Sequence, residues 1–536
     1  MFSNLLRNFG FLAVALPLLL VGCGGGEWGA EYAKGQPGTD PAKMWDGSGE
    51  WDPEYDDTSL KTVAVLLPLS GANGALGTGI QHAIEIAFFQ MQPKNIMVAF
   101  HDIGGKDEDK RRVMETVLAS SPNMIIGPLF ADDVAMMKEL KPLEIPALTF
   151  TSAKQSLGDG VFSLALLPNQ AVEAIVQQIN AENHKRVLVL APDTRTGYML
   201  ANNALASAKI YNVEIAGMYF YEEGYADKMK ELSEQVAFFQ ARAENLTAAK
   251  EILSDILINQ KISAHDKDDV KTQLEEMNKR ESLGQAPFDA VLLLGNAADS
   301  KTLAAYLRYY DVSTTIPFFG SALWDTDIVY RDSALSGGSY AGLPRISDAF
   351  VKLYSDIEGV RPNRFNTIGY DAAMLTIKSL GGKKPVPAYL LDPSGYTGLD
   401  GLVRLRPNGE NERALHVMQL NGVTWPRIKK RAAKNFIEPI YQTSGYNLGR
   451  PGAIKLENQG YDPLDYITLP VGIKGTYKSK SYGESQRAPT SDSMENTYME
   501  VAQPDDNETV IDSDFRPARP SAVDRQMIDE VQMRAN

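Results

Sequence analysis

The fold of this chain is decided by the stretch Lys61-Thr62-Val63-Ala64-Val65-Leu66-Leu67-Pro68-Leu69-Ser70-Gly71. Its residues 62–67 are apolar or β-branched without a polar interruption, which predicts a strand that is buried on both faces. A glycine-rich turn follows over residues 70–79, and the pattern of residues 80–90 predicts a helix. A strand, a turn and a helix in this order predict a parallel sheet covered by helices.

The same alternation continues along the chain. Four more short runs predict strands, and each lies next to a helical pattern: residues 97–100, 124–126, 146–150 and 187–190. Strands that alternate with helices are typical of doubly covered parallel sheets. The predicted fold class is therefore α/β.

Composition and charge exclude several classes of function. The chain has 536 residues, and its 68 acidic side chains outnumber its 53 lysines and arginines, giving a formal charge of −15. Such an acidic chain lacks the cationic surface that nucleic-acid binding needs. One cysteine cannot form an intrachain disulfide, and the five histidines show no metal-ligand spacing. We therefore expect no nucleic-acid partner, no metal site and no cofactor.

The first 22 residues have the pattern of an export signal. Arg7 precedes an apolar run over residues 9–21, which is too short to span a bilayer comfortably and ends in small residues. The segment Leu20-Val21-Gly22-Cys23 is similar to a bacterial lipobox, in which the cysteine is acylated, for example with palmitate. The alternative is a chance cysteine after an ordinary signal peptide. We expect lipid attachment at Cys23, and Gly24 after it favours an outer-membrane anchor facing the periplasm.

Segments outside the α/β pattern are predicted from composition. We expect a tether over residues 23–59, an irregular extension over 426–476 and a disordered tail over 477–536. Residues 225–282 have no strand pattern and predict a helical hairpin inserted into an α/β domain.

The insertion carries an apolar stripe formed by Met229, Leu232, Val236 and Phe239. Something must cover this stripe, because monomers rarely expose long apolar patches. The hairpin could lie on its own domain, or it could form an arm that meets a partner. We predict that the insertion is the partner surface.

Catalytic motifs are not found in the sequence. It contains no Gly-x-Ser-x-Gly elbow, His-Glu-x-x-His pair or Ser-x-x-Lys motif. The glycine-rich turn at residues 71–79 could bind an anion at a helix start, but it lacks the Lys-Ser/Thr ending of a phosphate loop. We therefore expect a protein that is not an enzyme.

The quoted opening stretch resembles the first strand and loop of type I periplasmic binding proteins of the leucine-binding kind. The resemblance covers about residues 60–425 and includes Ile126-Gly127-Pro128-Leu129, residues 145–152 and Gly369-Tyr370-Asp371-Ala372-Ala373. It implies two lobes joined by three crossovers. Lobe one would comprise residues 60–164 and 343–384, and lobe two would comprise residues 165–342 and 385–425.

Within this superfamily the chain resembles the penicillin-binding-protein activator lipoproteins of the LppC type. The resemblance rests on the lipobox, the charged helical insertion, Leu323-Trp324-Asp325, residues 398–404 and Arg406-Pro407-Asn408-Gly409. It implies a non-enzymatic regulator whose partner is a peptidoglycan synthase, that is, a penicillin-binding protein. Activators of this type also carry a helical-repeat domain, which residues 24–59 are too short to hold.

The resemblance also implies which residues could contact a ligand in the cleft: Ser70, Thr151, Ser152, Tyr198 and Asp325. Amino-acid receptors of this fold hold the ligand carboxylate with hydroxyl and backbone N–H groups. Here Asp132 stands where serines are usual, Thr196 takes the usual tyrosine position, and Asp325 is the nearest acid to the usual glutamate. These departures disfavour an α-amino acid. The alternative function is a solute receptor of an ABC-type transporter for amino acids, peptides or cell-wall fragments.

Overall fold

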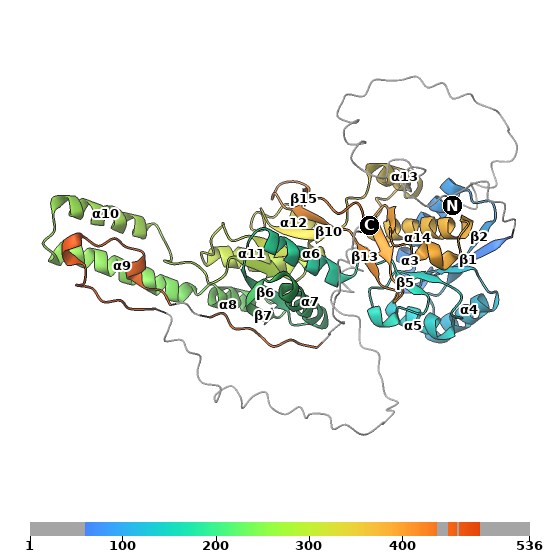
Figure 1. Cartoon of the computed structure of the whole chain (residues 1–536), viewed down its shortest axis with the longest axis horizontal. Helices are drawn as coiled ribbons and strands as arrows, with labels where there is room; N and C mark the ends of the chain where they lie inside the picture. The colour runs from blue at the N-terminus through green and yellow to red at the C-terminus, as the bar shows by residue number, and fades with distance from the viewer. Residues whose placement is uncertain (1–58, 437–448, 458–459, 483–536) are drawn as a thin grey trace, which may run out of the picture. The chain divides into compact units, whose positions relative to one another are not determined.

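The computed structural model describes residues 59–436, 449–457 and 460–482, and its elements are labelled as in Figure 1. Five parallel strands form the first sheet, in the order β2-β1-β3-β4-β5. They are β1 (Lys61–Leu67), β2 (Ile96–Asp102), β3 (Met124–Ile126), β4 (Ala147–Thr149) and β5 (Val161–Ser163). The expected signal peptide, the lipid-bearing cysteine, the tether up to residue 58 and the tail after residue 482 lie outside the described residues.

Helices cover both faces of the first sheet. They are α3 (Gly74–Met91), α4 (Asp107–Ala119), α5 (Ala131–Leu140), α13 (Asp348–Glu358), α14 (Arg364–Gly381) and α15 (Val386–Leu390). Val63, Val65 and Leu67 of β1 face the core with α3 and α14, whereas Ala64 and Leu66 face α4 and α5. The apolar run is therefore buried on both faces, as predicted.

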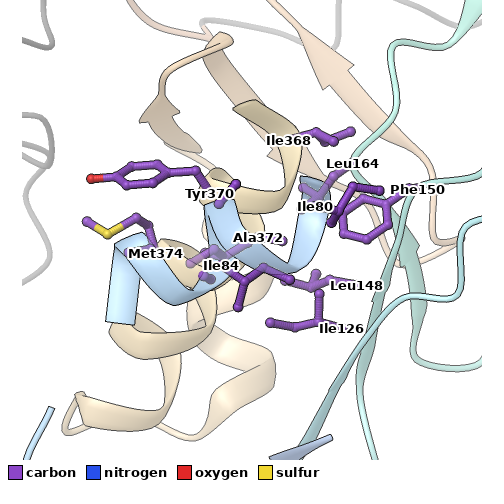
Figure 2. Packing of buried hydrophobic residues seen from close by; sticks show 14 of the residues in the cluster. Ile80, Ile84, Ile126, Leu148, Phe150, Leu164, Ile368, Tyr370, Ala372 and Met374 are labelled. Carbon is purple, nitrogen blue, oxygen red and sulfur yellow. The ribbon is translucent and has the colours of Figure 1, made fainter. Parts of the chain in front are cut away.

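Helix α14 returns from much later in the chain to complete this core. Figure 2 shows Ile84 of α3 together with Ala372 of α14 and with the strand residues Ile126 and Leu148. All four side chains are fully buried, with no solvent-accessible surface. The α14 segment is thus an integral part of lobe one.

The second sheet has seven strands in the order β15-β14-β10-β9-β8-β6-β7, and β14 runs antiparallel to both of its neighbours, β10 and β15. The strands are β6 (Arg186–Pro192), β7 (Glu214–Tyr221), β8 (Ala290–Leu293), β9 (Phe318–Gly320), β10 (Ser339–Gly342), β14 (His416–Gln419) and β15 (Arg427–Lys430). Its helices are α6 (Pro168–Ala181), α7 (Arg195–Tyr211), α8 (Ala226–Val236), α11 (Ala297–Tyr309) and α12 (Asp327–Tyr330). Strand β15 corrects the prediction of an irregular extension from residue 426, because this segment pairs with β14 at the sheet edge.

A third, small sheet corrects the predicted lobe boundary. Its strands are β11 (Tyr396–Gly398), β12 (Gly401–Leu405) and β13 (Asn411–Arg413). We predicted residues 385–425 for lobe two, but Leu390, Tyr396, Val403 and Leu405 lie in the hydrophobic core of lobe one. Their apolar side chains are buried against that core, so residues 386–405 belong to lobe one.

The inserted segment contains three helices rather than the predicted hairpin. Helix α8 belongs to the body of lobe two, where Met229 and Val236 are buried and Leu232 and Phe239 pack against the same core. Phe238, with φ 50°, separates α8 from α9 (Phe239–Asn259), and α10 (Ala264–Asn278) packs along α9. The apolar stripe is therefore covered by the chain's own lobe, which was one of the two alternatives. That the insertion is the partner surface stays a prediction.

The apolar face between α9 and α10 is covered by the C-terminal segment, which we define as residues 449–457 and 460–482. Ile467, Ile473 and Tyr477 pack with α9 and α10, and Figure 1 shows this segment running along the two helices. Short helical turns η4 (Pro463–Asp465) and η5 (Val471–Ile473) lie within it. The tail predicted from residue 477 is thus ordered through residue 482, where Tyr482 pairs with Tyr461.

Candidate functional site: a charged cavity between the two sheets

A cavity of about 260 Å³ lies where segments from both large sheets meet. Its walls come from the ends of β4 and β10, the crossover after β5, the turn η3 (Ala322–Trp324), the start of α14 and the turn after β11. The lining residues are Phe150, Ala165, Leu166, Ala322, Asp325, Gly342, Leu343, Arg364, Phe365, Ile368 and Asp400. Most of the wall is apolar, and the charged groups are Asp325, Arg364 and Asp400.

Arg364 joins the two lobes through this cavity. Its Nη1 lies 3.0 Å from Asp400 Oδ1 within lobe one, and its Nη2 lies 3.3 Å from Asp325 Oδ2 in lobe two. Asn363 caps the helix that begins with Arg364, and its side chain accepts the backbone N–H groups of Phe365 and Asn366. Burial opposes the guanidinium charge, but Asp400 and Asp325 outweigh it and raise the pKa of Arg364.

Asp325 is held in place by two tyrosines of lobe two. The hydroxyls of Tyr330 and Tyr340 donate to its Oδ1 at 2.5 and 2.9 Å. Burial and the neighbouring Asp325 raise the pKa of both tyrosines, so both hydroxyls stay protonated and keep donating. The other carboxylate oxygen is then available to Arg364.

Asp400 is held by a network inside lobe one. Thr367 Oγ1 donates to its carboxylate at 2.9 Å, and its backbone N–H donates to Asp371 Oδ2 at 3.1 Å. Nη1 of Arg413, whose side chain is buried, lies 3.3 Å from the backbone oxygen of Asp400. Burial and the neighbouring Asp400 raise the pKa of Asp371. Both carboxylates that bind Arg364 are thus positioned before any ligand arrives.

This arrangement determines what the cavity can bind. An incoming ligand carboxylate would have to displace Asp325 or Asp400 from Arg364, at a large cost because Asp400 is buried. The charges at the site are one guanidinium and two carboxylates, already paired within the protein. The geometry therefore supports a closed internal contact rather than an amino-acid site.

The structure does not bring the five predicted ligand residues together. Asp325 lines the cavity. Thr151 is buried next to Phe150, and its Oγ1 accepts the backbone N–H of Ala153 at 3.1 Å, while half-buried Ser152 follows it.

The other two predicted ligand residues, like Thr151 and Ser152, are not among those that line the cavity. Ser70 is exposed, and its backbone N–H donates to Asp102 Oδ1 at 3.2 Å. Tyr198 donates to Asp193 Oδ1 at 2.6 Å and lies beside Arg450 of the C-terminal segment.

A carboxylate of the protein itself binds the backbone just before the glycine-rich turn at residues 71–79. Asp102 accepts the backbone N–H groups of Leu69 and Gly104, both at 2.8 Å. Burial opposes the charge, but the hydrogen bonds from Ser70, Gly104 and Leu69 outweigh it and lower the pKa of Asp102.

Sequence reasoning missed Arg364, Asp400 and Arg413 as residues of the cavity network. Asp400 lies in the segment 398–404 that carried the family resemblance, so a signal for it was present. Arg364 precedes the resembling segment 369–373, and the Asn363 helix start was a second signal.

Neither a metal-binding cluster nor a membrane-spanning helix is found among residues 59–436, 449–457 and 460–482. They hold no group of three or more histidine, cysteine, aspartate or glutamate side chains that could bind a metal ion. None of their helices combines the length and the apolar character needed to cross a membrane.

Comparison with known proteins identifies the fold. Residues 61–245 match the family model described as periplasmic binding protein. A putative branched-chain amino acid ABC transporter protein of Rhodospirillum rubrum superimposes with a TM-score of 0.53 at 16% identity, covering 69% of this chain and 99% of that one. The chain therefore has the α/β fold of type I periplasmic binding proteins, as the sequence predicted.

Two similar proteins are activators of penicillin-binding proteins. The penicillin-binding protein activator LpoA of Photobacterium profundum is 20% identical over 314 residues, which are 58% of this chain. The matched region spans 47% of that relative, about half its length. The C-domain of LpoA from Haemophilus influenzae, described as a regulator of PBP1A, is 15% identical, with a TM-score of 0.46 and coverage of 69% of this chain and 100% of that domain. The match to the Photobacterium profundum activator confirms the predicted resemblance at the level of sequence similarity.

Proposed function

We propose that this chain is a non-enzymatic activator of a peptidoglycan synthase, anchored in the cell envelope and acting through protein contact. The observation that carries the proposal is the similarity over 314 residues to the penicillin-binding protein activator LpoA. The ion pairs of Arg364 with Asp325 and Asp400 support the proposal, because charges that are already paired within the protein need no ligand to neutralise them.

The location follows from the sequence at the N-terminus. The signal pattern of residues 1–22 and the lipobox cysteine Cys23 support an outer-membrane lipid anchor with the body in the periplasm. The synthase partner would then be a penicillin-binding protein whose periplasmic part reaches the same space.

The second candidate is a solute receptor of an ABC-type transporter. The superposition on the Rhodospirillum rubrum protein and the largely apolar cavity of about 260 Å³ favour it. The ion pairs of Arg364 with Asp325 and Asp400 disfavour an amino-acid ligand, but they do not disfavour a small apolar one.

Reconstitution tests the two candidates together. Glycan polymerisation and cross-linking by purified penicillin-binding proteins of the same organism are measured with and without this protein. An activator raises the rate of at least one synthase, and leucine, isoleucine and valine leave its melting temperature unchanged. A receptor leaves every synthase unaffected, and its ligand stabilises it by RT ln(1 + [L]/Kd).

A further inference from the structure

The segment that contains β15 is basic in an acidic protein. Residues 427–434 carry five cationic side chains and no acidic one, whereas the whole chain has a formal charge of −15. The five are Arg427, Lys429, Lys430, Arg431 and Lys434. Strand β15 forms one edge of the second sheet.

Four of these cations have no acidic partner among the residues that the structure describes, and three of the four also donate no side-chain hydrogen bond to those residues. Lys429 binds Glu182 at 2.6 Å, and Arg427 donates to the side-chain oxygen of Gln419 at 2.7 Å. The remaining three are exposed and form no ion pair with a described residue: Lys430, Arg431 and Lys434. Of the three, Arg431 also acts on the protein itself: burial lowers the pKa of His416, and the nearby Arg431 charge lowers it further.

An exposed tryptophan lies at the start of the same segment. Trp425 is 46% exposed, and its ring packs against that of Tyr330 with centroids 5.2 Å apart and planes tilted by 50°. The guanidinium groups of Arg345 and Arg361, from lobe one, lie 5.4 and 5.8 Å from its centroid. Val423, two residues earlier, is 71% exposed. An apolar centre is therefore bordered by cations.

The connection between β14 and β15 is a formed turn. The side-chain oxygen of Asn421 accepts the backbone N–H groups of Val423 and Thr424 at 3.0 and 2.8 Å. Gly422 adopts φ 72°, which favours glycine. The turn fixes the backbone that carries Val423, so little ordering is needed when this surface meets a partner.

The chemistry of this surface matches a protein contact. Tryptophan and arginine are the residue types most enriched among side chains that dominate binding energy, and peripheral charges steer association. Lysines on an edge strand discourage pairing with a foreign strand, so the contact would be made by side chains.

We propose that Val423, Trp425, Lys430, Arg431 and Lys434, which we call the β15 surface, dock an acidic face of the synthase. The inference rests on the proposed function and names the contact surface for it. The apolar stripe Met229 to Phe239 is covered by lobe two, and the apolar face of α9 and α10 is covered by the C-terminal segment. The β15 surface combines exposed apolar side chains with unpaired charge, and its positive charge selects an acidic partner.

Charge reversal with a matched control tests the β15 surface. The full-length protein is immobilised, and purified penicillin-binding proteins of the same organism are passed over it at two salt concentrations. The test variant combines Lys430→Glu, Arg431→Glu and Lys434→Glu. The control combines Lys267→Glu, Lys279→Glu and Arg280→Glu, which are exposed residues on or next to α10 and change the net charge equally.

We expect the test variant to bind at least about tenfold more weakly than the parent, with a slower and less salt-dependent association. The control should stay within about threefold of the parent, as expected for charges distant from the contact. Melting temperatures establish that each variant is folded. Trp425→Ala provides a second variant, which should speed dissociation while leaving the salt dependence of association unchanged.

The outcomes separate this inference from the proposed function. If the parent binds a synthase and the test variant binds it equally well, the β15 surface is not the contact, although the activator proposal stands. If the control loses binding instead, the contact lies on α9 and α10. If the parent binds no penicillin-binding protein, the activator proposal and this inference both fail.

A vesicle experiment tests whether the β15 surface binds an anionic lipid surface instead of a protein. Phosphatidylglycerol vesicles are offered to the parent and the test variant, which share the same N-terminus. A variant that loses vesicle binding but keeps synthase binding would assign the β15 surface to a lipid and overturn the inference.

Discussion

Gly77 and Gly197 occupy corresponding positions in the two lobes, near the start of the helix that follows the first strand of each sheet. A Cβ atom at either position would come 2.0 Å from a strand-end carbonyl oxygen, that of Pro68 or of Pro192. Real Cβ atoms do not approach backbone oxygens this closely. Glycine is therefore what allows each helix to pack directly against the end of its strand.

Replacing either glycine by alanine should destabilise the protein. Gly77→Ala and Gly197→Ala each force the helix away from the strand, at an expected cost of roughly 2 kcal/mol or more in the free energy of unfolding. Gly452→Ala is the control, because open space surrounds that position. Urea unfolding measures all three. If all three variants have the same free energy of unfolding, each helix moves away from its strand end at no cost in stability, which contradicts the prediction.

Glu173 predicts a pH dependence of stability. It is 1% exposed on α6, and Tyr211 donates to its Oε1 at 3.0 Å, while its Oε2 has no partner among the described residues. Burial raises its pKa from 4.5 to about 7, against the opposing effects of Tyr211 and Lys154. The folded protein therefore holds this proton more tightly than the unfolded chain does, and stability falls as pH rises from about 4.5 to about 7.

Glu173→Gln should remove this loss. The variant should be more stable than the parent at pH 8, by up to about 3 kcal/mol, and lose that advantage near pH 5. Unfolding in urea between pH 5 and pH 8 measures the difference, with the exposed Glu251→Gln on α9 as the control. A difference that does not change with pH would contradict the raised pKa.

At the scale of elements, Arg364 couples α14 of lobe one to the turn after η3 in lobe two. The two acids that it binds differ in burial: the Asp400 side chain is 2% exposed, and the Asp325 side chain is 28% exposed. An unpaired buried charge costs far more than a partly solvated one. The two ends of this contact should therefore respond differently to mutation.

Arg364→Met should lower the free energy of unfolding by about 3 kcal/mol, because it leaves the Asp400 carboxylate buried without its cation. Asp325→Asn should cost about 1 kcal/mol, because Tyr330 and Tyr340 still donate to the amide oxygen. Denaturant titration of both variants and of the double variant measures the coupling. If Asp325→Asn lowers the free energy of unfolding more than Arg364→Met does, the ion pair between the lobes contributes more to stability than the Arg364–Asp400 pair does.

The C-terminal segment stabilises the elements that it covers. The side-chain oxygen of Gln273 accepts the backbone N–H of Thr468 at 2.8 Å, and its side-chain nitrogen donates to the Thr468 oxygen at 3.2 Å. The Tyr477 hydroxyl donates to Asp255 of α9. Ile454 pairs with Met218 at the edge of the second sheet. The apolar face of α9 and α10 would be open to solvent without this segment.

Removing residues 460–536 should lower the melting temperature by several degrees and increase binding of a hydrophobic dye, because the face between α9 and α10 becomes exposed. Removing residues 484–536 alone is the control and should change neither value. If both truncations behave alike, the contacts of residues 460–482 do not contribute to stability.

The sequence predicted those features that depend on local pattern. Uninterrupted apolar runs such as residues 62–67 predicted strands buried on both faces, and this prediction is confirmed. The helix after the glycine-rich turn was predicted from residue 80 but begins at Gly74, because the glycines belong to its first turns.

Features that depend on distant partners could not be predicted from local pattern. Arg364 forms ion pairs with acids that lie 36 and 39 residues away in the chain. Tyr198 donates a hydrogen bond to Asp193, and Arg450, which lies 257 residues beyond Asp193, binds the same carboxylate. The assignment of residues 386–405 to lobe one likewise depends on which core buries their apolar side chains. Periodicity indicates that a residue is buried but does not identify its neighbours.

At the scale of the whole molecule, the proposed location depends on a single side chain. Cys23 is the only cysteine and follows the apolar run of the signal pattern. Cys23→Ser should abolish incorporation of labelled palmitate, because the thiol is the acceptor. Autoradiography of labelled cells measures this. Incorporation equal to that of the parent would contradict the lipobox assignment.

The contacts of the C-terminal segment also set an order of assembly. Gln273 and Thr468 are 195 residues apart in the chain, and Tyr477 lies 222 residues beyond Asp255. Because the covering residues come so much later in the chain, they are the last of these partners to be synthesised and exported, and α9 and α10 wait for them. During that interval their apolar face is open to chaperones and proteases, so the last part of lobe two to be completed is also the part most exposed to quality control.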